Sequence, residues 1–319
     1  MTTYSIIIPH KDIPKLLQRC LDSIPERDDI QIIIVDDNSD PNRVDFSIFP
    51  GLDRKNTEVY FTKEGKGAGY ARNVGLQHAK GKWLIFADAD DFFASDFSRM
   101  LDVYAESVYD VIYCKVESVD SDTLLPADWA NRAEINNRLL DEVQKNKDWD
   151  LLIAVVTPWG KFVKRTLIED NQIRFQEIRY SNDIYFSVRV ATVTTNILIS
   201  DFVSYCVTDR QGSLTSVLTV ESAKVRFFAA LDKFHYLKKL GKVTYYRSSF
   251  FGFWWFIFKK NKIQAISLLP QLIRVFDIKL LLIFLKGKHT NSIINAQCSS
   301  ESPAETAQAR TTKECTKAV

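Results

Sequence analysis

The residues best suited to chemistry in this chain are three aspartates that directly follow a short apolar run. Residues 83–87 are apolar at every position, a pattern typical of a strand buried on both faces, and Asp88, Asp90 and Asp91 come next. Carboxylates this close together repel one another unless a cation neutralises them. Because oxygen ligands favour hard cations, the pattern predicts a Mg²⁺ or Mn²⁺ site at which phosphates supply the remaining ligands. For an isolated Asp-x-Asp, a solvated acidic loop would be the preferred interpretation.

The elements that must position these aspartates alternate between strand and helix. Apolar runs and helical periodicity predict strands at 5–9, 30–35, 59–61, 82–87, 109–119, 161–163 and one or two within 197–207, and helices at 14–24, 70–79, 135–143 and 184–191. This alternation predicts an α/β fold with a doubly wound, mostly parallel sheet. The glycine-rich residues 65–69 are interpreted as a flexible lid or a helix start, and Gly81 is predicted to end the helix that follows.

Several polar residues fall at the carboxyl ends of these predicted strands. Pro9 ends the first strand, and Asp36 and Asp37 follow the second. Ligands of such sheets bind beyond the carboxyl ends of the strands. We therefore expect these residues to gather with Asp88 and Asp90 around one crevice.

Five short motifs follow one another in a characteristic order. They are Ser-Ile-Ile-Ile-Pro at 5–9, Val-Asp-Asp-Asn-Ser at 35–39, Ala-Arg-Asn-Val-Gly at 71–75, Phe-Ala-Asp-Ala-Asp-Asp at 86–91 and Asn-Asp at 182–183. In this order, over residues 4–215, they resemble the family 2 glycosyltransferases; each motif alone is weak, but the series is strong. The resemblance implies the GT-A (Rossmann-like) fold, with helices flanking the sheet, and a nucleotide-diphosphate sugar as substrate.

The resemblance also implies roles for the nucleotide-binding residues. Pro9 and Asp37 would line the nucleoside pocket, and Asp37 would accept a hydrogen bond from the base, whereas Asp36 supports the loop. Arg72 would face the base or the diphosphate, although a surface residue paired with a neighbour is the alternative. Asp88 would approach the ribose. Asp90 would hold the cofactor, Mn²⁺ or Mg²⁺, that bridges the phosphates.

The resemblance places the catalytic group at Asp183, which matches the general base of inverting members. An N-terminal charge favoured by the helix dipole is compatible with that role. Many relatives have Glu-Asp here, whereas this chain has Asn182-Asp183, so the pKa of Asp183 is expected to be less perturbed. Asn182 and Trp159 are acceptor candidates, and buried core is the alternative for Trp159.

The implied reaction is transfer of one sugar with inversion. Cleavage of the sugar–phosphate bond leaves negative charge on the diphosphate, which a divalent cation stabilises, while a carboxylate deprotonates the attacking hydroxyl. We expect a donor such as a UDP-sugar and a glycan or lipid-linked acceptor in surface polysaccharide synthesis, either lipopolysaccharide or capsule. Two alternatives are a catalytically silent nucleotide-binding protein and a nucleotidyltransferase, although residues 9–12 lack the Gly- and Lys/Arg-rich signature of the latter.

The remaining candidates are predicted to be structural. Lys161 and Arg210 are interpreted as solvated charges, although Arg210 lies where the family often brings a basic loop toward the diphosphate. His10 and His78 have no partners at metal-ligand spacing. The five cysteines show no close pairing and no zinc-ligand spacing, so reduced thiols in the cytoplasm are expected.

Charge divides the 319-residue chain unevenly. Residues 224–288 carry 14 Lys and Arg against two Asp, a net charge of +12, whereas residues 1–223 carry −10. We expect a nucleotide-sugar-binding half at 1–110, an acceptor-binding half at 111–223, a helical basic and aromatic extension at 224–290 and a disordered tail at 291–319. The extension could bind an anionic membrane surface, pack on the catalytic body or bind nucleic acid. The first is favoured, which predicts a protein peripheral to the inner face of the cytoplasmic membrane, with no nucleic-acid partner.

Overall fold

The structure, a computed structural model, describes residues 2–126, 132–209, 218–245 and 250–275. Its strands are β1 (Tyr4–His10), β2 (Ile30–Asp37), β3 (Thr57–Thr62), β4 (Trp83–Phe86), β5 (Phe92–Phe93), β6 (Val111–Asp120), β7 (Lys161–Lys164) and β8 (Ile197–Asp209). Its α-helices are α1 (Pro14–Asp22), α2 (Ala68–His78), α3 (Phe97–Tyr104), α4 (Arg132–Asn146), α5 (Arg165–Asp170), α6 (Ile184–Val193), α7 (Val220–Lys239), α8 (Phe250–Lys260), α9 (Lys262–Ser267) and α10 (Leu269–Val275). Short 3-10 helices lie at η1 (Phe46–Ile48), η2 (Trp149–Ala154) and η3 (Val243–Tyr245).

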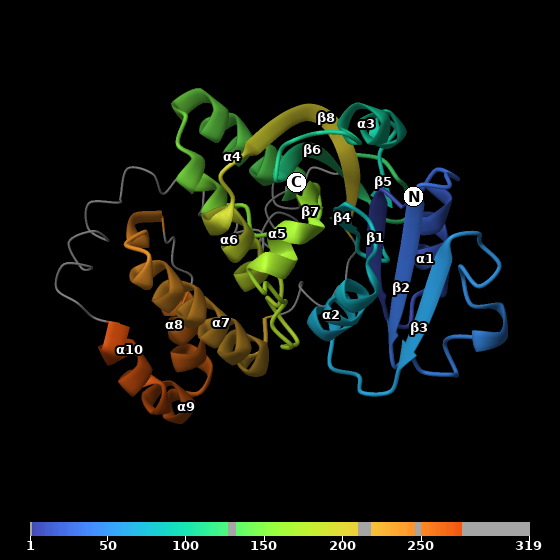
Figure 1. Ribbon diagram of the computed structural model, residues 1–319. Coiled ribbons are helices and arrows are strands. Elements are labelled where there is room, and N and C mark those ends of the chain that lie inside the picture. The colour runs from blue at the N-terminus through green and yellow to red at the C-terminus, as the bar shows by residue number, and fades with distance from the viewer. Residues whose placement is uncertain (1, 127–131, 210–217, 246–249, 276–319) are drawn as a thin grey trace, which may run out of the picture.

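The described strands form one mixed sheet in the order β3-β2-β1-β4-β7-β6-β8-β5 (Figure 1). β1 pairs in parallel with β2 and β4, β2 with β3, and β6 with β8. β7 runs antiparallel to β4 and β6, and β5 runs antiparallel to β8. The sheet is therefore mostly parallel and flanked by helices, as predicted, and the carboxyl ends of β1, β2 and β4 meet at one edge.

Two apolar cores lie on opposite faces of the central strands. Ile7 and Ile33 belong to the core that receives Ala71 of α2, whereas Ile6 and Ile32 belong to the core that receives Leu17 of α1. Neighbouring residues of a strand point to opposite faces, so a strand that is covered on both sides needs apolar residues throughout. This is why the uninterrupted apolar runs of the sequence predicted these strands correctly.

The first strand does not end at Pro9, as predicted, but continues to His10. The main-chain oxygen of Ile7 accepts a hydrogen bond from Ala87 (3.1 Å), so the odd-numbered residues of β1 bond toward β4. Strand β4 ends at Phe86, opposite Ile7. The missing N–H of Pro9 therefore falls beyond the paired part of β4, where proline is tolerated.

Gly81 does not end the preceding helix, as predicted. Helix α2 ends at His78, and the extended residue Ala79 follows it. A Cβ atom on Gly81 would lie 2.6 Å from the backbone nitrogen of Ser5. Glycine is therefore required here because the chain passes close to the backbone of β1.

The basic C-terminal segment is helical and packs on the rest of the chain. Helix α7 begins at a capping box formed by Thr219 and Ser222, so the predicted boundary at 223/224 falls inside this helix. Phe227, Phe234 and Leu237 of α7 are fully buried in the core that also contains α2 and α6. Of the three interpretations of the segment, packing on the body therefore describes α7.

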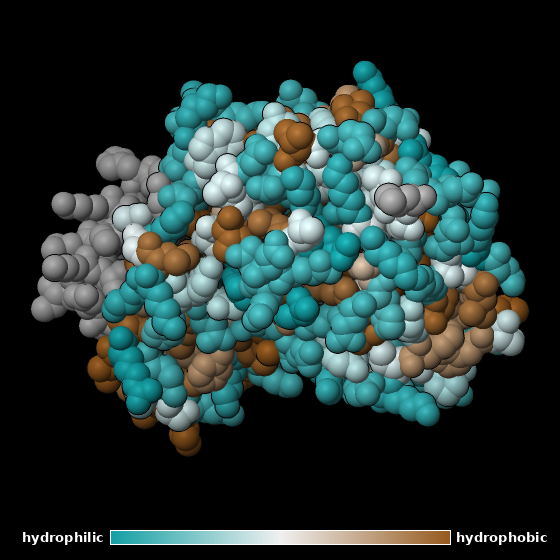
Figure 2. Space-filling model, in the orientation of Figure 1, coloured by the Kyte–Doolittle hydropathy of each residue, from teal (hydrophilic) through white to brown (hydrophobic). Residues whose placement is uncertain are grey.

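Helices α8 to α10 leave apolar side chains exposed on the outer side of this segment. In Figure 2, hydrophobic residues gather at the lower left, over the helices that Figure 1 labels α8 and α9. The most exposed are Phe251, Trp255, Ile263, Ile266 and Ile273. None of the described helices is both long enough and apolar enough to cross a membrane. The predicted disordered tail lies outside the described residues.

Candidate functional site

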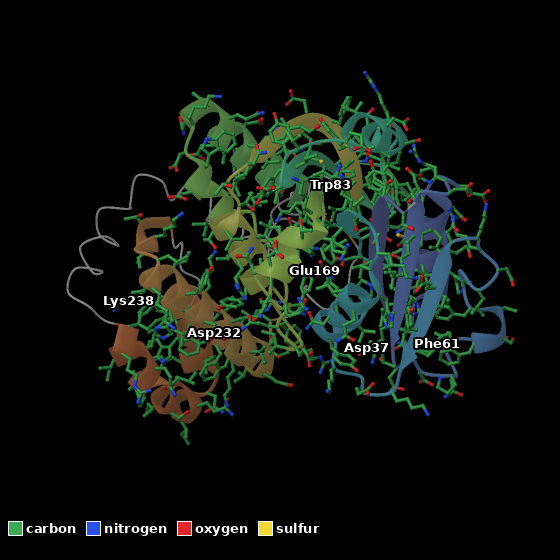
Figure 3. The ribbon with its side chains drawn as sticks, viewed as in Figure 1. Asp37, Phe61, Trp83, Glu169, Asp232 and Lys238 are labelled. Atoms are coloured by element: carbon green, nitrogen blue, oxygen red, sulfur yellow. The ribbon has the colours of Figure 1, made fainter. Side chains whose placement is uncertain are left out.

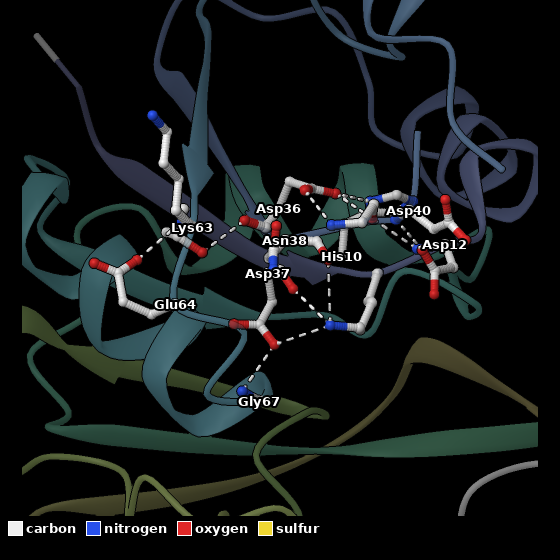
Figure 4. A network of polar contacts seen from close by, with 12 residues as sticks. His10, Asp12, Asp36, Asp37, Asn38, Asp40, Lys63, Glu64 and Gly67 are labelled. Atoms are coloured by element: carbon white, nitrogen blue, oxygen red, sulfur yellow. Dashed lines mark hydrogen bonds and ion pairs between the residues drawn. The ribbon is translucent and has the colours of Figure 1, made fainter. Parts of the chain in front are cut away.

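The loop after β2 is organised by a buried aspartate. Asp36 lies 2.7 Å from Nδ1 of His10 and accepts hydrogen bonds from the backbone nitrogen and hydroxyl of Ser39 at 2.9 and 2.5 Å (Figure 4). Burial acts to raise the pKa of Asp36, but these hydrogen bonds outweigh it, and the pKa is below its ordinary value. Asp36 and His10 thus hold the loop that presents Asp37.

Asp37 has one carboxylate oxygen engaged and one without a partner. Its Oδ2 accepts a hydrogen bond from the backbone nitrogen of Gly67 (2.8 Å) and lies 3.8 Å from Nζ of Lys11 (Figure 4). Its Oδ1 is buried and has no hydrogen-bond partner among the described residues. Burial raises the pKa of this carboxyl group. A buried acceptor without a donor is unfavourable, and a ligand that brings an N–H group would satisfy it.

The glycine-rich stretch is a helix start. Gly67 is the N-cap of α2 and has a φ of 93°, a conformation that favours glycine. Its backbone nitrogen provides the hydrogen bond to Asp37, and Figure 3 shows Asp37 beside this end of the helix. The stretch therefore ties α2 to the loop after β2.

The three aspartates after β4 occupy different environments. Asp91 is buried and accepts hydrogen bonds from the Tyr205 hydroxyl (2.9 Å) and the Thr208 backbone nitrogen (2.7 Å). Its pKa is raised well above the ordinary value, first by burial and then by the charges of Asp90 and Asp88. Asp91 therefore anchors the turn to β8, while Asp88 and Asp90 are only partly buried.

Arg72 connects two parts of the site that are far apart in the sequence. Its guanidinium donates to Oδ1 of Asn182 at 2.8 Å and to Oδ1 of Asp88 at 2.5 Å. The same group lies over the ring of Phe175, 5.3 Å from the centroid. Arg72 is 4% exposed, so it is a buried charge held between the turn after β4 and the residue before Asp183.

Asp183 stands at the N-terminus of α6 and is partly buried. Burial raises its pKa; the nearby charge of Arg72 acts to lower the pKa, Asp88 to raise it and Lys161 to lower it. The pKa of Asp183 is thus raised, mainly by burial. That Asn182, in place of Glu, makes this shift smaller than in relatives stays a prediction.

Two further candidates lie in buried positions. Lys161 is 3% exposed, so its interpretation as a solvated charge is wrong: its Nζ donates to the main-chain oxygens of Val155 (3.0 Å) and Thr157 (2.6 Å). Trp159 is 5% exposed, and its ring stacks on Tyr205 with centroids 5.8 Å apart. Trp159 therefore lies in the buried core, which was the alternative to an acceptor-binding role. Arg210 lies outside the described residues.

The histidines and cysteines are in structural positions. His10 is bonded to Asp36, and the ring of His78 stacks on Tyr60 with centroids 3.9 Å apart. Cys20, Cys114 and Cys206 are free thiols, all buried. Cys298 and Cys315 lie outside the described residues.

The donor set after β4 fits a hard cation only in part. Within the described part of the chain, no three His, Cys, Asp or Glu side chains form a group that could hold a metal. The negative charges of Asp88 and Asp90 nevertheless raise the pKa of Asp91, which is the repulsion that a cation would relieve. Asp90 could therefore hold a divalent ion whose remaining ligands come from a bound diphosphate.

Several residues that support the aspartates were not predicted from the sequence. Lys11 donates to the main-chain oxygen of Asp37 (2.8 Å), and Thr208 donates through its hydroxyl to that of Asp90 (2.6 Å). The hydroxyl of Tyr205 accepts a hydrogen bond from the backbone nitrogen of Asp88 (2.8 Å). Lys11 could have been predicted from its position close to Pro9 at the end of β1. No local pattern in the sequence indicates that Tyr205 or Thr208 supports the aspartates.

A mostly parallel sheet flanked by helices, with one antiparallel strand between its two halves, is the architecture of the GT-A class. The chain belongs to glycosyl transferase family 2, whose model matches residues 5–171. It is similar to glycosyltransferase GlyA of Streptococcus pneumoniae, with 26% identity over 67% of this chain and 32% of that protein. It is 25% identical to the uncharacterized glycosyltransferase EpsJ of Bacillus subtilis, over 67% of this chain and 63% of that one. The matched regions thus span about a third of the first relative and just under two thirds of the second.

The fold is shared with a solved glycosyltransferase structure. A crystal structure of Staphylococcus aureus TarS in complex with UDP-GlcNAc has a TM-score of 0.64, with 20% identity, and the alignment covers 94% of this chain and 90% of that one. The protein of that name is a poly(ribitol-phosphate) beta-N-acetylglucosaminyltransferase, 23% identical over 66% of this chain and 36% of its own length. At this level of identity the likeness shows the GT-A fold of this chain.

Proposed function

We propose that this protein transfers a sugar, with inversion, from a UDP-sugar to a hydroxyl group of a surface polysaccharide or polyol-phosphate polymer. The observation that carries the proposal is that one buried arginine of a family 2 chain, Arg72, bonds to Asp88 and to Asn182 and acts by its charge on the adjacent Asp183. The acceptor class is suggested by relatives whose names assign them glucosyl or N-acetylglucosaminyl transfer to poly(ribitol-phosphate).

The proposed nucleoside site is the end of β1 and β2, lined by Pro9 and Asp37. The buried Oδ1 of Asp37 is positioned to accept the ring N–H of a uracil, because it has no donor among the described residues. Lys11 and Gly67 hold the other atoms of Asp37, so the carboxylate keeps its orientation when the site is empty. Such preorganisation lowers the cost of ordering the site on binding.

The proposed diphosphate and ribose contacts come from the turn after β4. Asp88 would contact the ribose and remain oriented by its ion pair with the buried Arg72. The positive charge of Arg72 would also offset part of the negative charge of the aspartates at this edge of the sheet, so that a diphosphate is repelled less. A divalent ion held by Asp90 would supply charge stabilisation for the departing diphosphate.

The proposed general base is Asp183. A base works best when its pKa approaches the working pH, and burial raises the pKa of this carboxyl group. Asp183 would accept the proton of the attacking hydroxyl, while Asn182, held by Arg72, would orient the acceptor. With one base and no covalent nucleophile, the reaction proceeds as a single displacement with inversion.

A membrane-facing role is proposed for the surface of α8 to α10. Trp255 and Ile263 are 46% and 82% exposed there, and Lys259 lies over the ring of Trp255 at 5.8 Å. Aromatic and apolar side chains mixed with lysines suit the boundary of an anionic bilayer. This surface would keep the protein at the inner face of the membrane, near its acceptor.

Thermal-shift measurements test the donor proposal. The purified chain is heated with UDP-, GDP-, TDP- and CMP-sugars, with and without Mn²⁺, and Asp90→Ala is measured beside it. We expect stabilisation by the UDP-sugar that needs Mn²⁺ and is lost in Asp90→Ala, because binding to the folded state raises the melting temperature. No stabilisation of the well-folded protein by any of these sugars would contradict the proposal.

A further inference from the structure

Lys161 is a buried cation for which the proposed reaction has no direct use. It opens β7 opposite Tyr113 of β6, and its Nζ lies over the Tyr113 ring at 5.2 Å. Two of its three donor positions are used by the main-chain oxygens of Val155 and Thr157. A lysine is rarely this buried unless its charge is needed, because removal of an ammonium group from water is costly.

The contacts of Lys161 lead to the helix that carries Asp183. The main-chain oxygen of Thr157 accepts one hydrogen bond from Lys161 (2.6 Å) and another from the hydroxyl of Ser187 in α6 (3.0 Å). This one oxygen therefore joins β7 to the second turn of the helix. A shift of the 155–157 turn would be transmitted to the start of α6.

We propose that Lys161 is a positioning residue for Asp183: it holds the turn that supports α6, the helix at whose N-terminus Asp183 stands, and its charge acts on that carboxylate. This inference rests on the proposed role of Asp183 as the base. Lys161 does not contact the reacting sugar in this account and acts only through the carboxyl group.

The electrostatic surroundings of the pair are consistent with this role. The charged groups that act on Asp183 are Arg72 from α2, Asp88 from the turn after β4 and Lys161 from β7. Burial lowers the pKa of Lys161 to about 7, and the charge of Asp183 acts in the opposite direction. The ring of Tyr113, which faces the ammonium, has a pKa raised by burial and stays neutral near pH 7. A protonated Lys161 lowers the pKa of Asp183, so loss of that charge raises it.

A second buried lysine provides a matched control. Lys233 of α7 is 8% exposed and donates to the main-chain oxygen of Ile153 (3.3 Å), in the same stretch of chain that Lys161 supports. Burial lowers the pKa of Lys233 to about 8, and the charge of Asp183 is not among the causes of that shift. Lys161→Met and Lys233→Met thus both remove a buried ammonium that bonds to this stretch, and Lys161 is the one of the two that is among the main charges acting on Asp183.

The test measures the titration of Asp183 directly, by carbon NMR of the protein labelled at the aspartate carboxyl carbons. The signal of Asp183 is assigned by its absence from Asp183→Asn. We expect Lys161→Met to raise the pKa of Asp183 by about one unit, Lys161→Arg to leave it near the wild-type value, and Lys233→Met to leave it unchanged. An unchanged titration in Lys161→Met, or an equal shift in Lys233→Met, would overturn the inference.

A measurement on the wild-type chain covers the case in which Lys161→Met does not fold. If the two groups are coupled, the carboxyl signal of Asp183 shows a second inflection where Lys161 loses its proton, and a single inflection would refute the coupling.

Turnover of UDP-GlcNAc by Asp183→Asn distinguishes a failure of the proposal for Lys161 from a failure of the proposed base. Retained turnover would show that Asp183 is not the base. The NMR titration tests the effect of Lys161 on the pKa of Asp183 whichever result the turnover gives.

Discussion

At the scale of single residues, the two aspartates after β2 have opposite pKa shifts because their hydrogen bonds differ. Asp36 accepts hydrogen bonds from Ser39 and lies against His10, and its pKa is lowered although burial opposes this. Asp37 keeps one oxygen without a partner among the described residues, and burial raises its pKa. Of two adjacent carboxyl groups, one therefore belongs to the scaffold and the other is available to a ligand.

We predict that Asp37→Asn weakens UDP binding by about tenfold to a hundredfold, or about 1.4–2.8 kcal/mol, because an amide can present a donor where an acceptor is needed. Wild-type affinity should also fall on acidification at a higher pH than for an ordinary aspartate, since the raised pKa means that Asp37 gains a proton earlier. Titration calorimetry with UDP measures both effects.

The control for this prediction is Asp40→Asn in the same loop. Asp40 is exposed, and its carboxylate bonds only to Asn42 among the described residues. Its replacement should leave UDP affinity unchanged. Equal losses in the two variants would mean that the charge of the loop, and not the acceptor atom of Asp37, determines binding.

The individual site residues differ in how far the sequence could predict them. Asp36 and Asp88 were predictable because each directly follows an apolar strand, which is a local signal. The pairing of Arg72 with Asn182 was not, because it joins residues 110 positions apart. Lys161 was interpreted wrongly because lysines are mostly solvated, and only the register of β7 against β6 reveals that this one is buried.

At the scale of elements, most strands of both halves of the sheet could be predicted, but the order and direction of those in the second half could not. β1, β2 and β4 are continuous apolar runs that end in polar residues. β7 has four residues and runs antiparallel between β4 and β6. Strand direction depends on pairing partners far away in the sequence, so no local pattern revealed this insertion.

Helix α7 packs as part of the body formed by residues 1–223, in spite of its basic composition. It contacts the segment before Asp183 through Asp232, which accepts a hydrogen bond from Gln176 (2.8 Å; Figure 3 labels Asp232). Arg226 lies over the ring of Tyr180 at 5.6 Å, and the hydroxyl of Tyr236 lies 3.0 Å from that of Thr192 in α6. The predicted boundary at 223/224 followed a change in charge, which is a property of the surface and not of the core.

We predict that Phe234→Ala lowers the free energy of unfolding by about 3–5 kcal/mol, because it leaves a cavity in a fully buried position. Phe251→Ala in α8, where the side chain is 49% exposed, should cost less than about 0.5 kcal/mol. Urea denaturation monitored by circular dichroism measures both. Small and equal effects would show that α7 is not part of the core.

At the scale of the whole molecule, the acidic body and the basic helical segment are packed together. Among the described elements, α8 to α10 present most of the exposed apolar residues of the basic segment, and the proposed nucleotide-binding residues lie at the ends of β1, β2 and β4 (Figure 1). A surface that approaches a membrane through α8 to α10 would leave the strand ends free to bind a donor.

We predict that the full chain co-sediments with anionic vesicles and that binding falls as salt is raised, since screening weakens the attraction of the lysines. Trp255→Ser combined with Ile263→Ser should reduce binding, whereas Ile48→Ser, which removes an exposed apolar side chain of η1, should not. Equal binding by the double variant and the wild type would refute the proposed membrane surface.

The proposed transfer reaction depends on Asp183, and the most direct test compares turnover of a UDP-sugar by the wild-type chain and by Asp183→Asn, with UDP affinity measured on the same samples. We predict UDP affinity within about twofold of wild type and a loss of turnover of about 10²–10⁴-fold, the usual contribution of a general base. Wild-type turnover in Asp183→Asn would contradict the account, because the proton of the acceptor would then leave through another group.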